Sequence, residues 1–197
     1  YHERNLLGDG CFESNSGGLS NFGYDAVAEM NRLGILIDLS HVGVKTTTDV
    51  IEGSETPVCC THANAKAYYD VPRNKTDEAV KSLAQKGGVI GVTCIKTFLK
   101  TGANSALEDY VDAIDDMVER IGIDHVGIGT DFTQDQTYGF WRYITSQQGS
   151  SFPAKYIDPA VRFDRMELYP KGMETPDKFP ALADSLIRRG YRWQDVE

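Results

Sequence analysis

Predicted helices alternate with short apolar strands along most of this 197-residue chain, and the alternation limits the possible folds more than any other feature. Apolar residues at helical spacing, several times followed by glycine, predict the helices. These helices occupy residues 23–34, 44–53, 77–88, 107–122 and 177–189. The apolar runs between them predict strands at 35–39, 57–62, 89–95 and 125–132. Such alternation indicates a parallel α/β sheet, in either a barrel or a doubly wound fold.

The turns after the first predicted strands contain neither GxGxxG nor GxxxxGK[ST], which gives a nucleotide-binding doubly wound fold little support. A (β/α)8 TIM-type barrel usually takes ~250 residues. A chain of 197 residues with four recognisable strands therefore predicts one domain, residues 1–197, that supplies the later βα units of a barrel. The closing RWQDVE predicts the first turn of another helix, and a long polar loop is predicted to run to about residue 175.

Composition excludes some classes of partner. The net charge of −9 argues against nucleic acid, because phosphate binding needs a basic face. No apolar run approaches the ~20 residues that span a bilayer, and no signal peptide is visible, so we expect a cytoplasmic location. The four cysteines lack zinc-ribbon or redox spacing and are expected to be small buried thiols. Tyr1 is not an initiator methionine, so we expect the true N-terminus to lie upstream.

Three polar residues follow predicted strands. His41 ends the first strand, His62 the second and Asp131 the fourth. In a parallel barrel, catalytic residues lie at the carboxyl ends of strands. His125 precedes its strand, so we predict a structural role for it on the opposite rim.

Alternation along the strands predicts where these side chains point. His41 shares a face with Leu39, and His62 with Cys60; if these faces point into the barrel, both imidazoles reach its mouth. Asp131 shares a face with Gly129 and Gly127, and their missing side chains would leave room for a bulky group beside the carboxylate. Two imidazoles and a carboxylate suit zinc, although a catalytic site usually has three protein ligands. The alternative, hydrogen bonding of each histidine within a packed rim, stays open from these residues alone.

Three further polar residues have two interpretations each. Arg73 is either a surface residue or a bidentate clamp for a substrate carboxylate. His2 is either a terminal surface residue or a polar group that reaches the site. Asp38 has the wrong parity for the mouth, and we expect it to orient a neighbour or to pair with a helix.

Three segments carry a resemblance to a known family. EMNRLGILIDLSH, THANAKAYYDVPRN and GIDHVGIGTDF resemble the renal (membrane) dipeptidase family of the amidohydrolase superfamily, in particular its bacterial members. The similarity covers nearly all of the chain. It implies a (β/α)8 barrel with a binuclear zinc site that hydrolyses dipeptides.

The resemblance also implies roles for single residues. His41 and His62 match the two histidines that hold one of two zinc ions. Asp131 matches the aspartate that handles the proton of the bridging water. Arg73 matches the arginine that grips the substrate carboxylate, and His2 matches a histidine that polarises the scissile carbonyl or binds its oxyanion.

The chain departs from the family pattern in several places. A His-x-Asp pair and a bridging carboxylate have no match, so the N-terminal part with the first strands is expected to be absent. Thr133 replaces an acid and Phe98 replaces a tyrosine of some members, which puts substrate preference in question. The alternatives are hydrolysis of another amide or a lactone, or a fragment that needs the missing part for activity. The expected partner is a dipeptide, and a homodimer is the assembly considered.

Overall fold

The computed structural model describes residues 2–133, 136–137, 139 and 167–196. Its sheet has three parallel strands in the order β1-β2-β3. The strands are β1 (Cys59–Cys60), β2 (Val89–Val92) and β3 (Val126–Ile128). The pairing aligns Cys60 with Ile90 and Ile90 with Val126. Helix α3 (Asp77–Gln85) lies between β1 and β2 in the sequence, and α4 (Leu107–Ile121) between β2 and β3, so the chain is an α/β protein of consecutive βα units.

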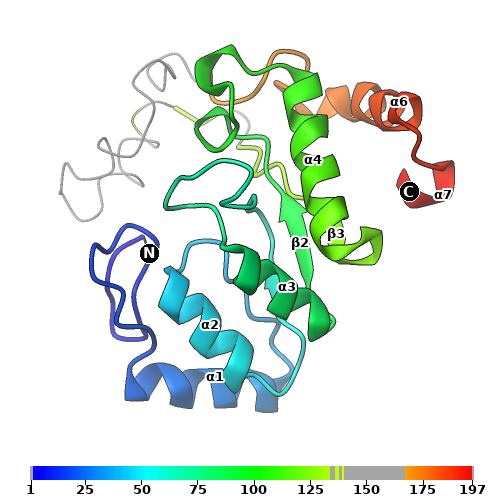
Figure 1. Ribbon diagram of the computed structural model, residues 1–197. Coiled ribbons are helices and arrows are strands. Elements are labelled where there is room, and N and C mark those ends of the chain that lie inside the picture. Colours follow the sequence, from blue (N-terminus) through cyan, green and yellow to red (C-terminus); the bar gives the residue numbers. More distant parts are fainter. Residues whose placement is uncertain (1, 134–135, 138, 140–166, 197) are drawn as a thin grey trace.

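The helices pack on one side of this sheet. Figure 1 shows α2, α3 and α4 side by side, with α6 against α4 and α1 below α2. The remaining elements are α1 (Asn21–Leu33), α2 (Val44–Gly53), α6 (Phe179–Arg189), α7 (Trp193–Val196), η1 (Lys96–Phe98), η2 (Gly102–Asn104), η3 (Ile123–His125) and η6 (Pro176–Lys178). The five predicted helices and the final helical turn are confirmed within a few residues. The predicted polar loop lies largely outside the described residues.

Local signals in the sequence explain where the helices begin and end. The Ser20 side chain caps α1 by accepting a hydrogen bond from the Gly23 amide. Gly34 ends this helix with a φ of 71°, a conformation that favours glycine. The Thr76 side chain caps α3 in the same way as Ser20 caps α1.

The core lies between the sheet and the helices, and it shows that one condition stated in the sequence analysis, that the faces of Leu39 and Cys60 point into a barrel, is not met. Leu39 and Cys60 are buried in a cluster that includes Val50 of α2 and Leu83 of α3. The face that carries them therefore points toward the helices and not into a barrel. Alternation shows which residues share a face, but it does not show which face the helices cover.

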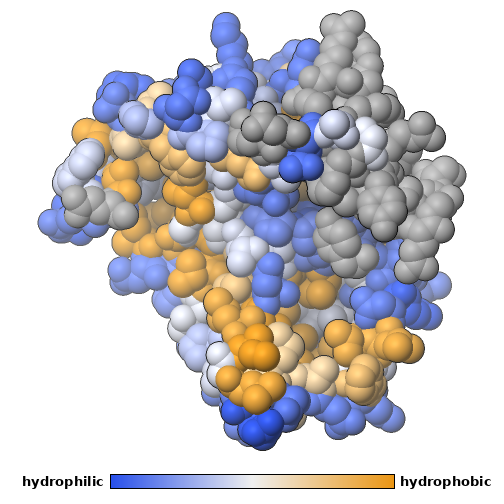
Figure 2. Space-filling view, turned by 180° about the vertical axis from the view of Figure 1, so that it is seen from behind, coloured by the Kyte–Doolittle hydropathy of each residue, from blue (hydrophilic) through white to orange (hydrophobic). Residues whose placement is uncertain are grey.

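The predicted strand at 35–39 is also shorter than expected. Only Asp38 is bridged, in parallel to Cys59, with flanking bonds from the Leu39 amide to the Cys59 carbonyl and from the Cys59 amide to the Ile37 carbonyl. No described segment pairs with the other edge of residues 35–39. At the start of this predicted strand, Ile35 and Leu36 are 46% and 63% exposed, whereas Ile37 and Leu39 are buried. Seen from behind, the molecule shows several apolar patches (Figure 2).

All four cysteines are buried free thiols, as predicted. None of the helices in the described ranges has the length and apolar character needed to cross a membrane.

Candidate functional site

Four of the predicted site residues lie in one cluster. The Nε2 atom of His2 lies 2.6 Å from Nδ1 of His41, and Nε2 of His41 lies 2.8 Å from Nε2 of His62. The carboxylate of Asp131 follows at 3.8 Å from Nε2 of His62. Residues far apart in the sequence thus form a continuous row of three imidazoles and a carboxylate beyond the carboxyl ends of the strands.

The histidines reach this cluster through turns that follow the strands. His41 lies in a turn after Asp38, and His62 in a bend after β1. Asp131 has a φ of 55°, which turns the chain sharply after β3. Because the chain changes direction at these positions, the histidines reach the site although Leu39 and Cys60 face the helices.

A close approach of three backbone segments holds the turns together. A Cβ atom at Gly129 would lie 2.1 Å from the Thr61 carbonyl oxygen, and one at Gly91 would meet the same atom at 2.1 Å. The prediction that Gly129 leaves room for a bulky group is therefore wrong, since backbone already fills that space. Glycine here brings the chain before His62 close to the chain before Asp131.

The environment keeps the imidazoles neutral. Burial, assisted by the nearby Arg73 charge, lowers the pKa of His62 to about 4 and that of His2 to about 3. The same two causes lower the pKa of His41. Burial raises the pKa of Asp131. Neutral imidazole is the form that binds metals, because one of its ring nitrogens keeps a lone pair.

Arg73 is inside the protein and not on its surface, with an exposed fraction of 1%. Its guanidinium donates to the Ser40 carbonyl and, at 3.0 Å, to the His62 carbonyl. It also lies 5.6 Å from the centre of the Phe98 ring. No carboxylate among the described residues is within ion-pair distance of it. Arg73 is thus a buried cation that is tied to both histidine turns.

Lys75 adds a second buried cation, which the sequence did not indicate. Its ammonium donates to the Val42 carbonyl at 2.8 Å and to the Thr47 hydroxyl at 3.3 Å. Burial lowers its pKa to about 8. The residues on either side of His41 are Ser40 and Val42. Their carbonyls therefore accept hydrogen bonds from two cations of the same loop, Arg73 and Lys75. Nothing in the composition of DVPRNKTD distinguishes this lysine from a surface residue.

Tyr169 is a further contact that sequence reasoning missed. Its hydroxyl donates to the Asp131 carbonyl at 2.7 Å and accepts from the Thr133 amide at 3.0 Å. Its ring packs edge-on against Phe132. Tyr169 thereby fixes the turn that carries the Asp131 carboxylate.

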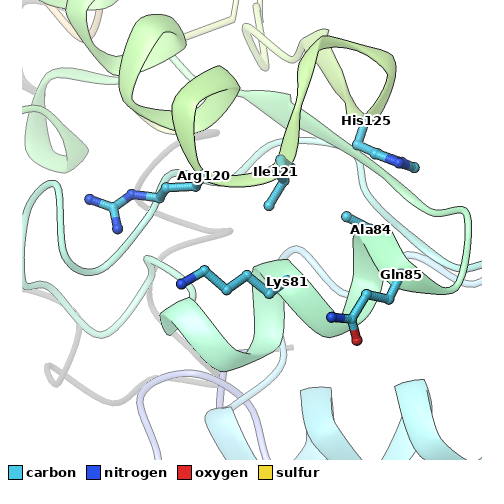
Figure 3. Close-up of a pocket in the computed structure, with 6 residues that line it drawn as sticks. All are labelled: Lys81, Ala84, Gln85, Arg120, Ile121 and His125. Carbon is cyan, nitrogen blue, oxygen red and sulfur yellow. The ribbon is translucent and has the colours of Figure 1, made fainter.

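A cleft at the opposite end of the strands has a different character. It is lined by Lys81, Ala84, Gln85, Arg120, Ile121 and His125, as Figure 3 shows. The Arg120 guanidinium is paired with Asp77 and Asp116, so its charge is neutralised. The His125 ring hydrogen-bonds the Gly88 carbonyl at 2.9 Å, beside the start of β2. These contacts join α3, α4 and the sheet, in agreement with the structural role predicted for His125.

The donor set of the histidine cluster is compatible with part of a metal site. Two neutral imidazole nitrogens, those of His41 and His62, face each other, and imidazole is a common ligand of zinc. Within the described part of the chain, no group of three or more potential ligands is arranged around one point. These residues therefore fit a metal as two ligands of a larger set.

Comparisons with known proteins identify a family. The sequence model of the family described as membrane dipeptidase (peptidase family M19) matches residues 2–146. Dipeptidase verJ of Clonostachys rogersoniana is 32% identical over 96% of this chain, which covers 41% of that protein.

Solved structures of an amidohydrolase and of a metallo peptidase are also similar to this chain. An amidohydrolase from Pseudomonas aeruginosa is 42% identical, with a TM-score of 0.87 over 100% of this chain and 58% of its own. A metallo peptidase from Rhodobacter sphaeroides, liganded with a phosphinate mimic of the dipeptide L-Ala-D-Ala, is 26% identical, with a TM-score of 0.74 over 98% of this chain and 49% of its own. The chain thus spans 41–58% of the length of these three relatives. It belongs to the membrane dipeptidase family, peptidase family M19.

Proposed function

We propose that the protein hydrolyses the peptide bond of dipeptides in a zinc-dependent reaction. The row formed by His2, His41, His62 and Asp131 at the strand ends is the observation that carries this proposal. The family membership and the bound dipeptide mimic in the Rhodobacter structure support it. We further propose that residues 1–197 form one domain, the later βα units of a (β/α)8 barrel.

His41 and His62 would hold one zinc ion, and the complete enzyme would bind two. Zinc, when bound, lowers the pKa of a water molecule to about 7 and polarises a carbonyl group. Both imidazoles are neutral, so neither would oppose the ion with a positive charge.

Asp131 is proposed as the general base and acid. Its partly buried carboxylate would accept the proton of the attacking water and pass it to the leaving amine. Burial raises the pKa of Asp131, which favours this transfer. His2 would donate a hydrogen bond to the oxygen of the scissile carbonyl as negative charge develops there.

Arg73 is proposed to attract the carboxylate end of the dipeptide. The supporting observation is its charge, which is buried and has no carboxylate in ion-pair distance among the described residues. A buried cation without a counter-ion is costly, and a substrate carboxylate would supply one. This anchor would limit substrates to about two residues, because the carboxylate would sit close to the scissile bond.

Steady-state kinetics on a panel of dipeptides tests the proposal. The panel includes dipeptides with a D-residue in second place and dehydropeptides, assayed with the protein at its natural length. Arg73→Lys keeps the charge but loses the fork, so KM for dipeptides should rise at least about tenfold. Arg188→Lys is the matched control, because Arg188 is 66% exposed on α6. An unchanged KM in Arg73→Lys would remove Arg73 from this role.

Hydrolysis of another amide or a lactone is the second candidate function. It is favoured by the 42% identity to a protein described as an amidohydrolase. Phe98 lies against the guanidinium of Arg73 and offers no hydroxyl to a substrate carboxylate. Turnover of such amides or lactones, with every dipeptide of the panel left intact, would replace dipeptide hydrolysis as the proposed function.

A further inference from the structure

The Asp38 carboxylate joins the two turns that carry His41 and His62. One oxygen, Oδ1, accepts from the Ser40 amide at 3.0 Å, the Ser40 hydroxyl at 2.6 Å and the Thr61 amide at 2.9 Å. The other oxygen, Oδ2, accepts from the Thr61 hydroxyl at 2.7 Å. Ser40 directly precedes His41 and Thr61 directly precedes His62, so one side chain connects both histidine turns.

The protons of this network can be assigned from its donors and acceptors. A carboxylate at neutral pH carries no proton, so each hydroxyl that bonds it must be the donor. The Thr61 oxygen also lies 2.8 Å from Nδ1 of His62. Because the single proton of Thr61 points to Asp38, this second contact requires Nδ1–H of His62 as the donor. The contact between the Ser40 and Thr61 hydroxyls, at 3.1 Å, is longer than either hydroxyl–carboxylate bond.

We propose that Asp38, acting through Thr61, fixes His62 in the tautomer that carries its proton on Nδ1. The lone pair of Nε2 then faces His41 at 2.8 Å and Asp131 at 3.8 Å, where a metal ligand is required. Asp38 and Thr61 are positioning residues, because they act on the site only through His62. The purpose of this tautomer rests on the proposed function, whereas the tautomer itself does not.

The substitution Asp38→Asn reverses the network without changing the size of the side chain. The amide oxygen can keep the three donors that now bond Oδ1. The amide nitrogen then takes the place of Oδ2 and donates to the Thr61 oxygen. The Thr61 hydroxyl then has two acceptors within reach, Nδ1 of His62 at 2.8 Å and the Ser40 oxygen at 3.1 Å, and the shorter contact favours Nδ1, which becomes an acceptor. The proton of His62 moves to Nε2 and occupies the lone pair that faces the site.

Nitrogen-15 NMR of histidine-labelled, metal-free protein reads this tautomer directly. The His62 signals are those that disappear in His62→Gln. We expect Nδ1–H in the wild type and in Thr61→Ser, Nε2–H in Asp38→Asn, and no fixed tautomer in Thr61→Val. Zinc affinity should fall about 10–100-fold in Asp38→Asn and keep the wild-type value in Thr61→Ser.

A wild-type His62 with its proton on Nε2, or an unchanged tautomer in Asp38→Asn, would overturn the inference. If Asp38→Asn does not fold, the pair Thr61→Ser and Thr61→Val decides: the same tautomer in both would overturn it. A protein that switches tautomer but binds no zinc would refute the proposed function and leave this inference standing.

Discussion

Gly129 provides a demanding test of how the site is assembled. In Gly129→Ala, the added Cβ would lie 2.1 Å from the Thr61 carbonyl oxygen and 2.7 Å from that of Gly91. Carbon and oxygen atoms of neighbouring strands normally stay about 3.3 Å or more apart. The backbone around Thr61 must therefore move by roughly 1 Å. Both close atoms are backbone oxygens, so no side-chain rotation can relieve the clash.

The size of the effect follows from this geometry. Overpacking in a filled interior costs about 1–3 kcal/mol, and a backbone clash belongs at the upper end. The displacement also strains the bond from the Gly129 amide to the Val92 carbonyl, now 2.9 Å and worth about 1 kcal/mol. We expect the free energy of unfolding to fall by about 3–4 kcal/mol in Gly129→Ala.

Gly127→Ala, two residues earlier and inside β3, is the matched control. Its Cβ would first meet a side-chain methyl of Val89 at 3.7 Å, which is ordinary contact. Urea unfolding of both variants, followed by circular dichroism, should show a change within about 1 kcal/mol for this control. Equal stability of the two variants would refute the close approach at Thr61. Failure of Gly129→Ala to fold, with a normal Gly127→Ala, would support it.

Two other predictions concern single buried groups. Burial lowers the pKa of Lys75 to about 8 from 10.5, so the folded state loses this proton first and the free energy of unfolding should rise between these pH values. The rise of about 3 kcal/mol, measured by urea unfolding across this range, should be absent in Lys75→Met, and its persistence there would contradict the assignment. Tyr110→Phe removes the 2.8 Å bond from its buried hydroxyl to the Val92 carbonyl, and urea unfolding should show a loss of about 1 kcal/mol; no loss would mean that the bond is not formed.

The sequence predicts the helices well because their signals are local. Each signal comes from residues within or next to the helix itself. Examples are the caps Ser20 and Thr76, the glycine at position 34 and the apolar stripe of α4. The order of the βα units follows from the same signals. The location of His41, His62 and Asp131 at the carboxyl ends of strands could likewise be read from the sequence.

The remaining features depend on which backbone segments meet. Alternation shows that His41 shares a face with Leu39 and His62 with Cys60, but it leaves the side of the sheet open, because the position of the helices is not a property of one strand. The sequence predicted open space at Gly129. The backbone that fills this space belongs to Thr61, which lies 68 positions earlier in the sequence. The burial of Lys75 had no signal in the sequence, because its hydrogen bond to the Val42 carbonyl joins residues 33 positions apart.

Zinc affinity of the purified protein tests the central claim most directly, namely that His41 and His62 bind the metal. We would measure it by competition with a coloured chelator for the wild type, His41→Gln, His62→Gln and the control His125→Gln. Loss of affinity in the first two variants, with wild-type affinity in the control, is the expected result. Wild-type affinity in His62→Gln would contradict the account, because Nε2 of His62 faces both His41 and Asp131.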